Sequence, residues 1–128
     1  MKTSEANIEI TRKFSEISSV SVIMPTWRQP DDEILSVSIP LLGLKTTARN
    51  IDDADVAIQE AIKCFLIACE RFGQGAEKEL EAIGWSLLSK ENGTSLLNYS
   101  IEQTQTSIIL EQIMETGEQY AEHDLVLS

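Results

Sequence analysis

The sequence predicts an α+β domain: an antiparallel three- to four-stranded sheet covered by one long helix, with a C-terminal hairpin and helix. Apolar residues recur at every second position in the first part of the chain, as in half-buried strands. Beyond residue 52 they recur at every third or fourth position, as on one face of a helix. A length of 128 residues suits one core and is short for two. We therefore expect a single domain over residues 1–128.

The strands are predicted from alternation and from the residues that interrupt it. Ile8 and Ile10 alternate with polar neighbours, and Pro25 and Pro40 end two later alternating runs because proline cannot donate to a sheet ladder. The segment 26–33, TWRQPDDE, has the composition of a turn. Short connections favour an antiparallel meander. The strands are expected at 7–14, 20–24, 33–40 and, as a short fourth piece, 44–50.

The long helix is predicted over residues 52–72. Asn50 or Asp52 can cap its start, and the acids that follow suit the positive end of the helix dipole. Gly73 and Gly75 mark its end. Its apolar face is expected to pack on the sheet and contains Ile58, Ile62, Phe65, Cys69 and Phe72.

The rest of the chain is predicted to add three elements. A brief helical stretch covers residues 76–84. The pair Asn92-Gly93, flanked by leucines, is typical of the turn of a β-hairpin. Residues 107–123 place apolar side chains on roughly one face of a second amphipathic helix, which Gly117 weakens.

The formal net charge is −11, and it is unevenly distributed. Residues 1–90 contain 14 acids and 10 bases, whereas residues 91–128 contain seven acids and no lysine or arginine. Such a field repels phosphate backbones and attracts basic partners, so we expect no direct nucleic-acid binding. The alternative, that the acidity only keeps the protein soluble, stays open.

The composition predicts a soluble, cytoplasmic protein with no membrane partner. The first residues, MKTSEANIEIT, lack the apolar region of a signal peptide, and no apolar run approaches the roughly 18 residues of a membrane span. Cys64 and Cys69 lie five residues apart in the predicted helix and point in different directions, so they cannot bridge each other. We expect both to be small buried apolar residues in a reducing compartment.

No catalytic, cofactor-binding or metal-binding residue is assigned, and we expect no enzymatic activity. The single histidine, His123, lies near the C-terminal end, and GQG at 73–75 lacks the further glycine and the lysine of a phosphate-binding loop. The carboxylates at 31–33 and 52–55 could in principle hold metal ions for nuclease chemistry. However, a predicted turn and a helix start are places where acids are expected anyway.

Trp27 is a candidate interface residue. It lies beside Arg28 between two prolines, and exposed tryptophans commonly anchor interfaces. The alternative is that its ring folds back over the edge of the sheet. Both interpretations stay open, and the residues that bind a partner are not assigned.

Residues 43–62, GLKTTARNIDDADVAIQEAI, resemble the HicB-type antitoxin family, and the resemblance extends over about 6–72. It implies a truncated ribonuclease-H-like unit, a three-stranded meander followed by a helix and a further strand. It also implies a protein that neutralises a small basic toxin that cleaves messenger RNA. Residues 73–128 then form an acidic C-terminal extension. The matching positions are Pro40, Gly43, Thr46, Asp52, Asp53, Ala54, Glu60, Ala61 and Ile62.

Two departures from the family pattern limit what the resemblance implies. Ala48 and Arg49 replace the usual glycine and aspartate, and the C-terminal part lacks the basic character of a DNA-binding segment. Binding of a basic, toxin-like partner can therefore transfer without autorepression, or only the fold can transfer. The alternatives are an accessory module of a mobile element that forms a homo-oligomer, an acidic mimic of DNA and, last, a nuclease that depends on Asp31 or Asp52.

Overall fold

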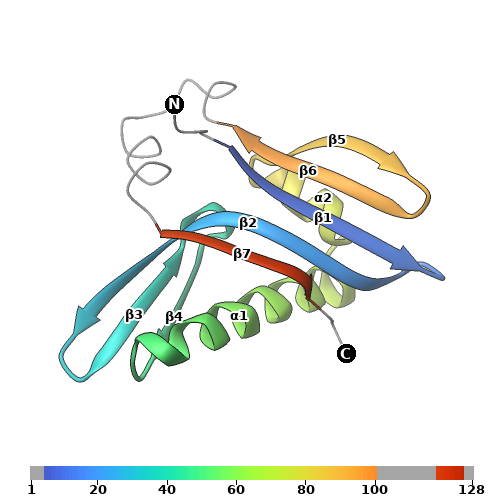
Figure 1. Ribbon diagram of the computed structural model, residues 1–128. Helices are drawn as coiled ribbons and strands as arrows, with labels where there is room; N and C mark the ends of the chain where they lie inside the picture. The colour runs from blue at the N-terminus through green and yellow to red at the C-terminus, as the bar shows by residue number, and fades with distance from the viewer. Residues whose placement is uncertain (1–4, 101–117, 126–128) are drawn as a thin grey trace.

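The computed structural model describes residues 5–100 and 118–125, and shows an antiparallel sheet with helices packed against it (Figure 1). The strands are β1 (Glu5–Lys13), β2 (Glu16–Asp31), β3 (Ile34–Ile39), β4 (Leu44–Ala48), β5 (Ser86–Glu91), β6 (Thr94–Ser100) and β7 (Glu118–Leu125). The helices are the short 3-10 turn η1 (Pro40–Leu42), the long helix α1 (Ile51–Phe72) and α2 (Ala76–Ala82).

Strand β2 organises the sheet because three strands pair with it. The strand order is β4-β3-β2-β1-β6-β5, and β7 pairs with β2 outside this path. Residues 16–23 of β2 pair with β1, residues 20–26 with β7 and residues 27–31 with β3, all antiparallel. Since residues near Val22 pair with both β1 and β7, these two strands lie on opposite edges of β2.

The α+β class agrees with the sequence prediction, but the expected size of the sheet is wrong. Within the described residues the sheet has seven strands rather than three to four. The hairpin β5–β6 was expected as a separate C-terminal feature, whereas β6 pairs with β1 from Glu5↔Ser100 to Thr11↔Thr94. Alternation in a sequence indicates a strand but not its neighbours, so it could not show that these strands join one sheet.

The predicted turn at 26–33 is also wrong, because β2 continues through most of it. Pro25 and Pro30 both lie within the strand, and the chain turns only between Asp31 and Ile34. Proline is tolerated where its missing N–H faces an edge without a neighbouring strand. The pairing of β1 with β2 ends at Ile23, so, within the described residues, β1 no longer borders β2 at Pro25.

The helices before residue 85 are close to the prediction. Helix α1 begins after Asn50, whose side chain accepts a hydrogen bond from the backbone N–H of Asp53 at 3.0 Å. Its buried face consists of Ala54, Ile58, Ile62, Leu66 and Cys69, whereas Phe72, expected on that face, is exposed. Asn92-Gly93 forms the turn of the β5–β6 hairpin, as predicted.

The predicted C-terminal helix at 107–123 is wrong where the structure describes it. Residues 118–123 belong to β7, in which Tyr120 pairs with Met24 of β2, and residues 107–117 lie outside the described residues. Over such a short stretch the apolar spacing is compatible with both the helical period of 3.6 residues and the strand period of two. This segment forms a strand because it pairs with the open edge of β2, and the pairing satisfies backbone hydrogen-bonding groups of both strands.

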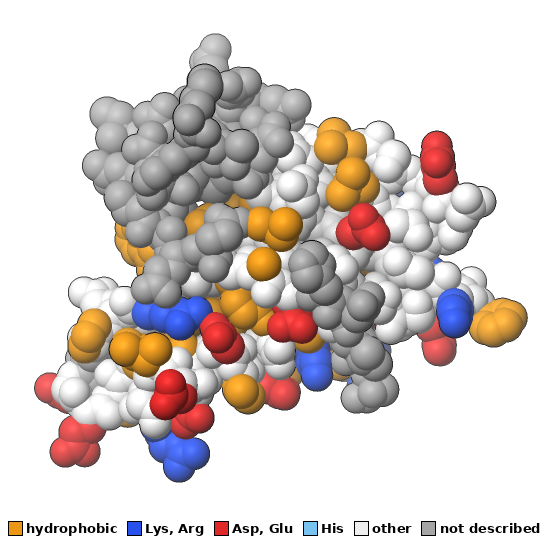
Figure 2. Space-filling view, in the orientation of Figure 1, with side chains coloured by type: hydrophobic (Ala, Val, Ile, Leu, Met, Phe, Trp, Pro, Cys, Tyr) orange, Lys and Arg blue, Asp and Glu red, His pale blue; other side chains and the backbone are white. Residues whose placement is uncertain are grey.

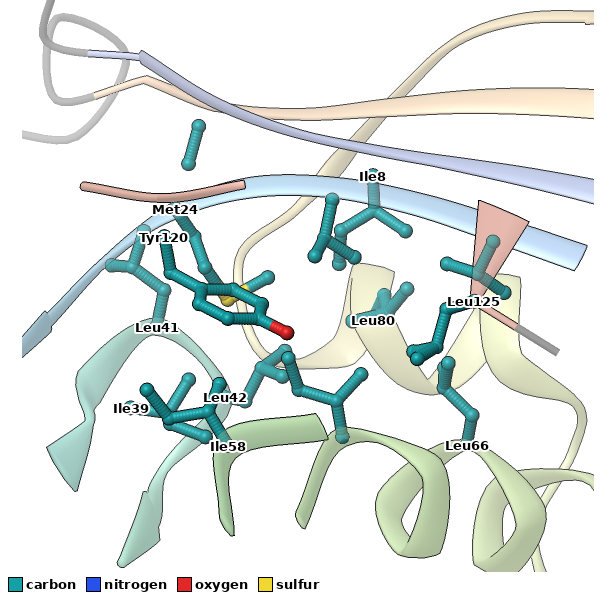
Figure 3. Close-up of a cluster of buried hydrophobic side chains, with 14 of the residues drawn as sticks. Ile8, Met24, Ile39, Leu41, Leu42, Ile58, Leu66, Leu80, Tyr120 and Leu125 are labelled. Carbon is teal, nitrogen blue, oxygen red and sulfur yellow. The ribbon is translucent and has the colours of Figure 1, made fainter. Parts of the chain in front are cut away.

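The core lies between the sheet and the helices and receives side chains from almost every element. Figure 3 shows Ile8, Met24 and Tyr120 pointing from the sheet toward Ile58 and Leu66 of α1. The indole N–H of buried Trp85 donates to the carbonyl of Leu41 at 3.1 Å. This bond fastens the loop before β5 to η1, so both ends of the sheet are tied to the same core.

Candidate interaction surfaces

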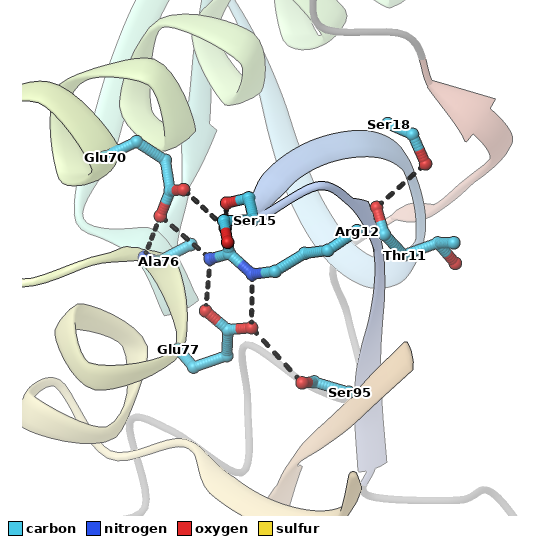
Figure 4. Close-up of polar contacts among 8 residues, drawn as sticks. All are labelled: Thr11, Arg12, Ser15, Ser18, Glu70, Ala76, Glu77 and Ser95. Atoms are coloured by element: carbon cyan, nitrogen blue, oxygen red, sulfur yellow. Dashed lines mark hydrogen bonds and ion pairs between the residues drawn. The ribbon is translucent and has the colours of Figure 1, made fainter. Parts of the chain in front are cut away.

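Arg12 occupies a position that the strand pattern reserves for a core residue. It follows Ile8 and Ile10 at intervals of two, so it points from β1 toward the helices. The pairing of β1 and β2 shifts register between Thr11 and Arg12. At this end of the sheet the chain places the last turn of α1 and the first turn of α2 beside β1 (Figure 4).

The guanidinium of Arg12 binds two carboxylates, which together form the Arg12 cluster (Arg12, Glu70 and Glu77). Toward Glu70, Nη1 donates to Oε1 at 2.6 Å and Nη2 to Oε2 at 2.9 Å. Toward Glu77, Nη2 donates to Oε1 at 2.5 Å and Nε to Oε2 at 3.0 Å. Such paired, charge-assisted bonds are the strong geometry for arginine. The cluster therefore connects β1, α1 and α2.

Neighbouring groups complete the cluster. The backbone N–H of Ala76 donates to Glu70 Oε2 at 2.7 Å, so Glu70 also binds the first residue of α2. Ser95 Oγ of β6 donates to Glu77 Oε2 at 3.2 Å, and Arg12 Nη1 donates to the carbonyl of Ser15 at 2.9 Å. Most of the polar atoms in this cluster are thus committed to one another.

The cluster holds its carboxylates in the charged form. Hydrogen bonding to Arg12 lowers the pKa of Glu77 to about 2 and also lowers the pKa of Glu70. The same bonds raise the pKa of Arg12. A carboxylate with such a low pKa is a poor general base near neutral pH. An open groove of about 570 Å³ lies over the cluster. The carboxylates of Glu70 and Glu77 that line this groove are already paired with Arg12. We interpret the cluster as structural.

A second groove, the hairpin groove, lies between the β2–β3 turn and the start of α1. It has a volume of about 430 Å³ and combines apolar and acidic side chains. Figure 2 shows such side chains gathered at the lower left, over the β2–β3 hairpin and the N-terminal end of α1. The groove is lined by Pro30, Asp32, Glu33, Ile34, Leu35, Arg49, Asn50, Ile51 and Asp52.

The hairpin groove brings together the two acidic segments singled out in the sequence. Asp32 and Glu33 lie in the β2–β3 turn, and Asp52 lies in the first turn of α1. Among the side chains that the structure describes, no three carboxylate, imidazole or thiol groups are arranged to hold a metal ion. The side chain of Asp31 lies outside the described part of the molecule.

The other sequence candidates are dispersed. Trp27 is 40% exposed and lies within β2 opposite Ser38, rather than in a turn. Cys69 is buried as predicted, whereas Cys64 is exposed, contrary to the prediction. His123 belongs to β7, and its side chain is outside the described residues. Neither Trp27 nor either cysteine lines one of the two grooves.

Sequence reasoning missed the Arg12 cluster. The available signal was an arginine in register with the apolar stripe of a strand, since a charge on a core face needs partners of opposite sign. The partners are 58 and 65 residues away in sequence, so only the fold could identify them.

Comparisons with protein-family models, curated proteins and solved structures found no significant match to this chain. The resemblance to HicB-type antitoxins stays a prediction. Neither helix in the described part of the chain has the length and apolar character needed to cross a membrane.

Proposed function

We propose that this protein is a non-catalytic binding protein that docks a small, basic macromolecular partner, in the manner of an antitoxin. The observation that carries the proposal is the excess of acids, 21 against 10 lysines and arginines. A field of this sign steers basic partners toward the protein and discriminates against phosphate backbones.

The distribution of charge on α1 supports this proposal. Asp52, Asp55 and Glu60 are exposed in its N-terminal half, whereas its bases, Lys63 and Arg71, follow in the C-terminal half. The acidic half lies beside the β2–β3 turn with its own exposed acids (Figure 2). The antitoxin-like part of the proposal rests on the resemblance of residues 43–62 alone.

Affinity purification followed by an RNA-cleavage assay tests the proposal. The full chain is immobilised and exposed at low salt to a lysate of its source organism, and bound proteins are eluted with rising salt. We expect a small lysine- and arginine-rich protein that elutes as ionic strength screens the attraction. Purified alone, it should cleave RNA, and an equimolar amount of this protein should stop the cleavage.

Two outcomes contradict different parts of the proposal. Retention of no basic protein at low salt would refute binding of a basic partner. A basic partner without RNA-cleaving activity would refute the antitoxin-like role and leave the binding role in place.

The second candidate, a homo-oligomeric accessory module, is favoured by one observation. Ile83, Leu87 and Leu88 are exposed beside β5, which pairs only with β6 among the described strands. Such an edge can pair with a second copy, although the register shift between Leu87 and Ser89 and the charge of Lys90 oppose this. Size-exclusion chromatography with light scattering distinguishes the candidates. A stable oligomer that Leu88→Lys dissociates supports the accessory role, and a monomer refutes it.

A further inference from the structure

The hairpin groove exposes apolar side chains that the fold itself does not use. Ile51 is the first residue of α1 and is 70% exposed. It follows the capping residue Asn50, and a hydrophobic staple would involve the residue before the cap, which here is Arg49. Ile51 therefore contributes neither to capping nor to core packing. Ile34, on the other side of the groove, is also exposed.

Single exposed apolar residues are normal on protein surfaces, so the grouping matters more than the exposure. Ile34 and Ile51 line one concavity, and Pro30 and the largely buried Leu35 line it as well. A concave site with apolar walls can hold an apolar side chain and remove it from water. A partner that fills the groove therefore needs an apolar side chain as well as a complementary charge.

The charged residues of the groove favour a cation. Asp32, Glu33 and Asp52 line it, and none of the three forms an ion pair with a described residue. The only base in the lining is Arg49, which pairs with Asp53 at 3.3 Å. The positive end of α1 contributes only about half an elementary charge. Three carboxylates outweigh it, so the groove as a whole is negative.

We propose that the hairpin groove binds a segment of the partner in which apolar side chains are flanked by lysine or arginine. This inference rests on the proposed function and names the surface that performs it. The apolar side chain of the partner would lie between Ile34 and Ile51, and its flanking cations would lie near Glu33 and Asp52. Charge would then guide the encounter, and apolar burial would hold the complex.

Methyl NMR titration of the full chain with three synthetic peptides tests the inference. The probe is KKLLKK, and the controls are KKSSKK, which keeps the charge, and EELLEE, which keeps the leucines. We expect KKLLKK to shift the methyl signals of Ile34 and Ile51. We expect KKSSKK to bind at least about tenfold more weakly, since burying an aliphatic side chain gives about that factor in affinity. We expect EELLEE to bind more weakly as well, because its glutamates are repelled by the acids that line the groove.

Matched substitutions separate this groove from other exposed apolar sites. Ile51→Ser should weaken binding of KKLLKK about tenfold, and Leu88→Ser, which alters a similarly exposed residue on β5, should leave it unchanged. Ile51 is exposed, so Ile51→Ser should unfold at nearly the wild-type denaturant concentration. That measurement excludes loss of the fold as the cause.

Four outcomes overturn the inference: shifts confined to other methyl groups, binding of either control peptide as tight as that of KKLLKK, full affinity in Ile51→Ser, or no binding of KKLLKK. The proposed function is judged separately with the partner eluted by salt. If that partner binds Ile51→Ser as tightly as wild type, the groove is wrong and the function stands. If no basic partner is retained at all, the function fails as well.

Discussion

Arg12 on the first strand donates to Glu70 at the end of the long helix at 2.6 Å, across 58 residues of sequence. The side chains of both residues are mostly shielded from solvent. Glu77 completes the cluster from α2, so one guanidinium joins β1 to two consecutive helices that lie about 60 residues further along the chain. Removing one member of the cluster should lower the free energy of unfolding, because the remaining charged groups would lose their partner.

Arg12→Met should lower the free energy of unfolding by about 2–3 kcal/mol, because it leaves two partly buried carboxylates facing each other without a cation. Methionine keeps the apolar stem of the side chain, so the loss reports mainly on charge. Urea unfolding with an unchanged m-value measures it. The control is Arg49→Met, which removes the exposed pair with Asp53 and should cost less than about 0.5 kcal/mol. Equal losses in the two variants would contradict the structural role of the cluster.

Stability should fall as the pH drops below about 4.5. The pKa of Glu77 is lowered in the folded protein from 4.5 to about 2, so its contribution is fully present above pH 4.5 and is lost as the pH falls toward 2. The lowered pKa of Glu70 acts in the same direction. Thermal unfolding between pH 2 and pH 7 measures the slope. Introduced into the wild type, Glu77→Gln should make stability depend less on pH. Introduced into Arg12→Met, the same substitution should change the pH dependence little. A slope unaltered by Glu77→Gln would show that other groups control acid unfolding.

Gly84→Ala should destabilise the protein more than Gly43→Ala. Both glycines have positive φ, 111° and 67°, so a side chain is strained at either position. At Gly43 a Cβ would meet nothing within 4 Å, whereas at Gly84 it would lie 2.8 Å from Cε2 of Tyr99. The ring of Tyr99 packs edge-to-face on buried Trp85, with centroids 5.7 Å apart, and cannot move without disturbing the core. We expect a cost of about 1 kcal/mol at Gly43 and at least about 2 kcal/mol at Gly84, measured by urea unfolding.

One of the two thiols should react rapidly with Ellman's reagent at pH 8 and the other slowly. Cys64 is exposed on α1, whereas burial raises the pKa of Cys69 to about 11. At pH 8 only about a thousandth of the Cys69 thiol would be thiolate, which is the reactive form. Cys64→Ser should abolish the rapid phase and Cys69→Ser should retain it. Two rapid thiols in the folded protein would show that the packing around Cys69 opens readily.

Local patterns predicted the elements whose neighbours in sequence stabilise them. The start of α1 follows from a cap at Asn50 or Asp52, of which the structure uses Asn50, and the β5–β6 hairpin follows from Asn92-Gly93. Each of these signals acts over a few residues. Predictions failed where pairing with a strand distant in sequence determines the secondary structure. The sequence pattern predicts a strand that ends at Pro25, whereas β2 continues past it, and it predicts a helix at Tyr120, which instead pairs with Met24 of β2.

The sequence by itself determined the α+β class, the long capped helix, the acidic character and the two acidic segments near residues 32 and 52. These properties depend on composition and on interactions between near neighbours. Only the tertiary structure decided that the seven described strands share one sheet, that Arg12 lies between Glu70 and Glu77, and that Ile34 and Ile51 line one groove. Each of these is a contact between segments far apart in the chain, and no local preference encodes which distant segment will satisfy an open strand edge or a buried charge.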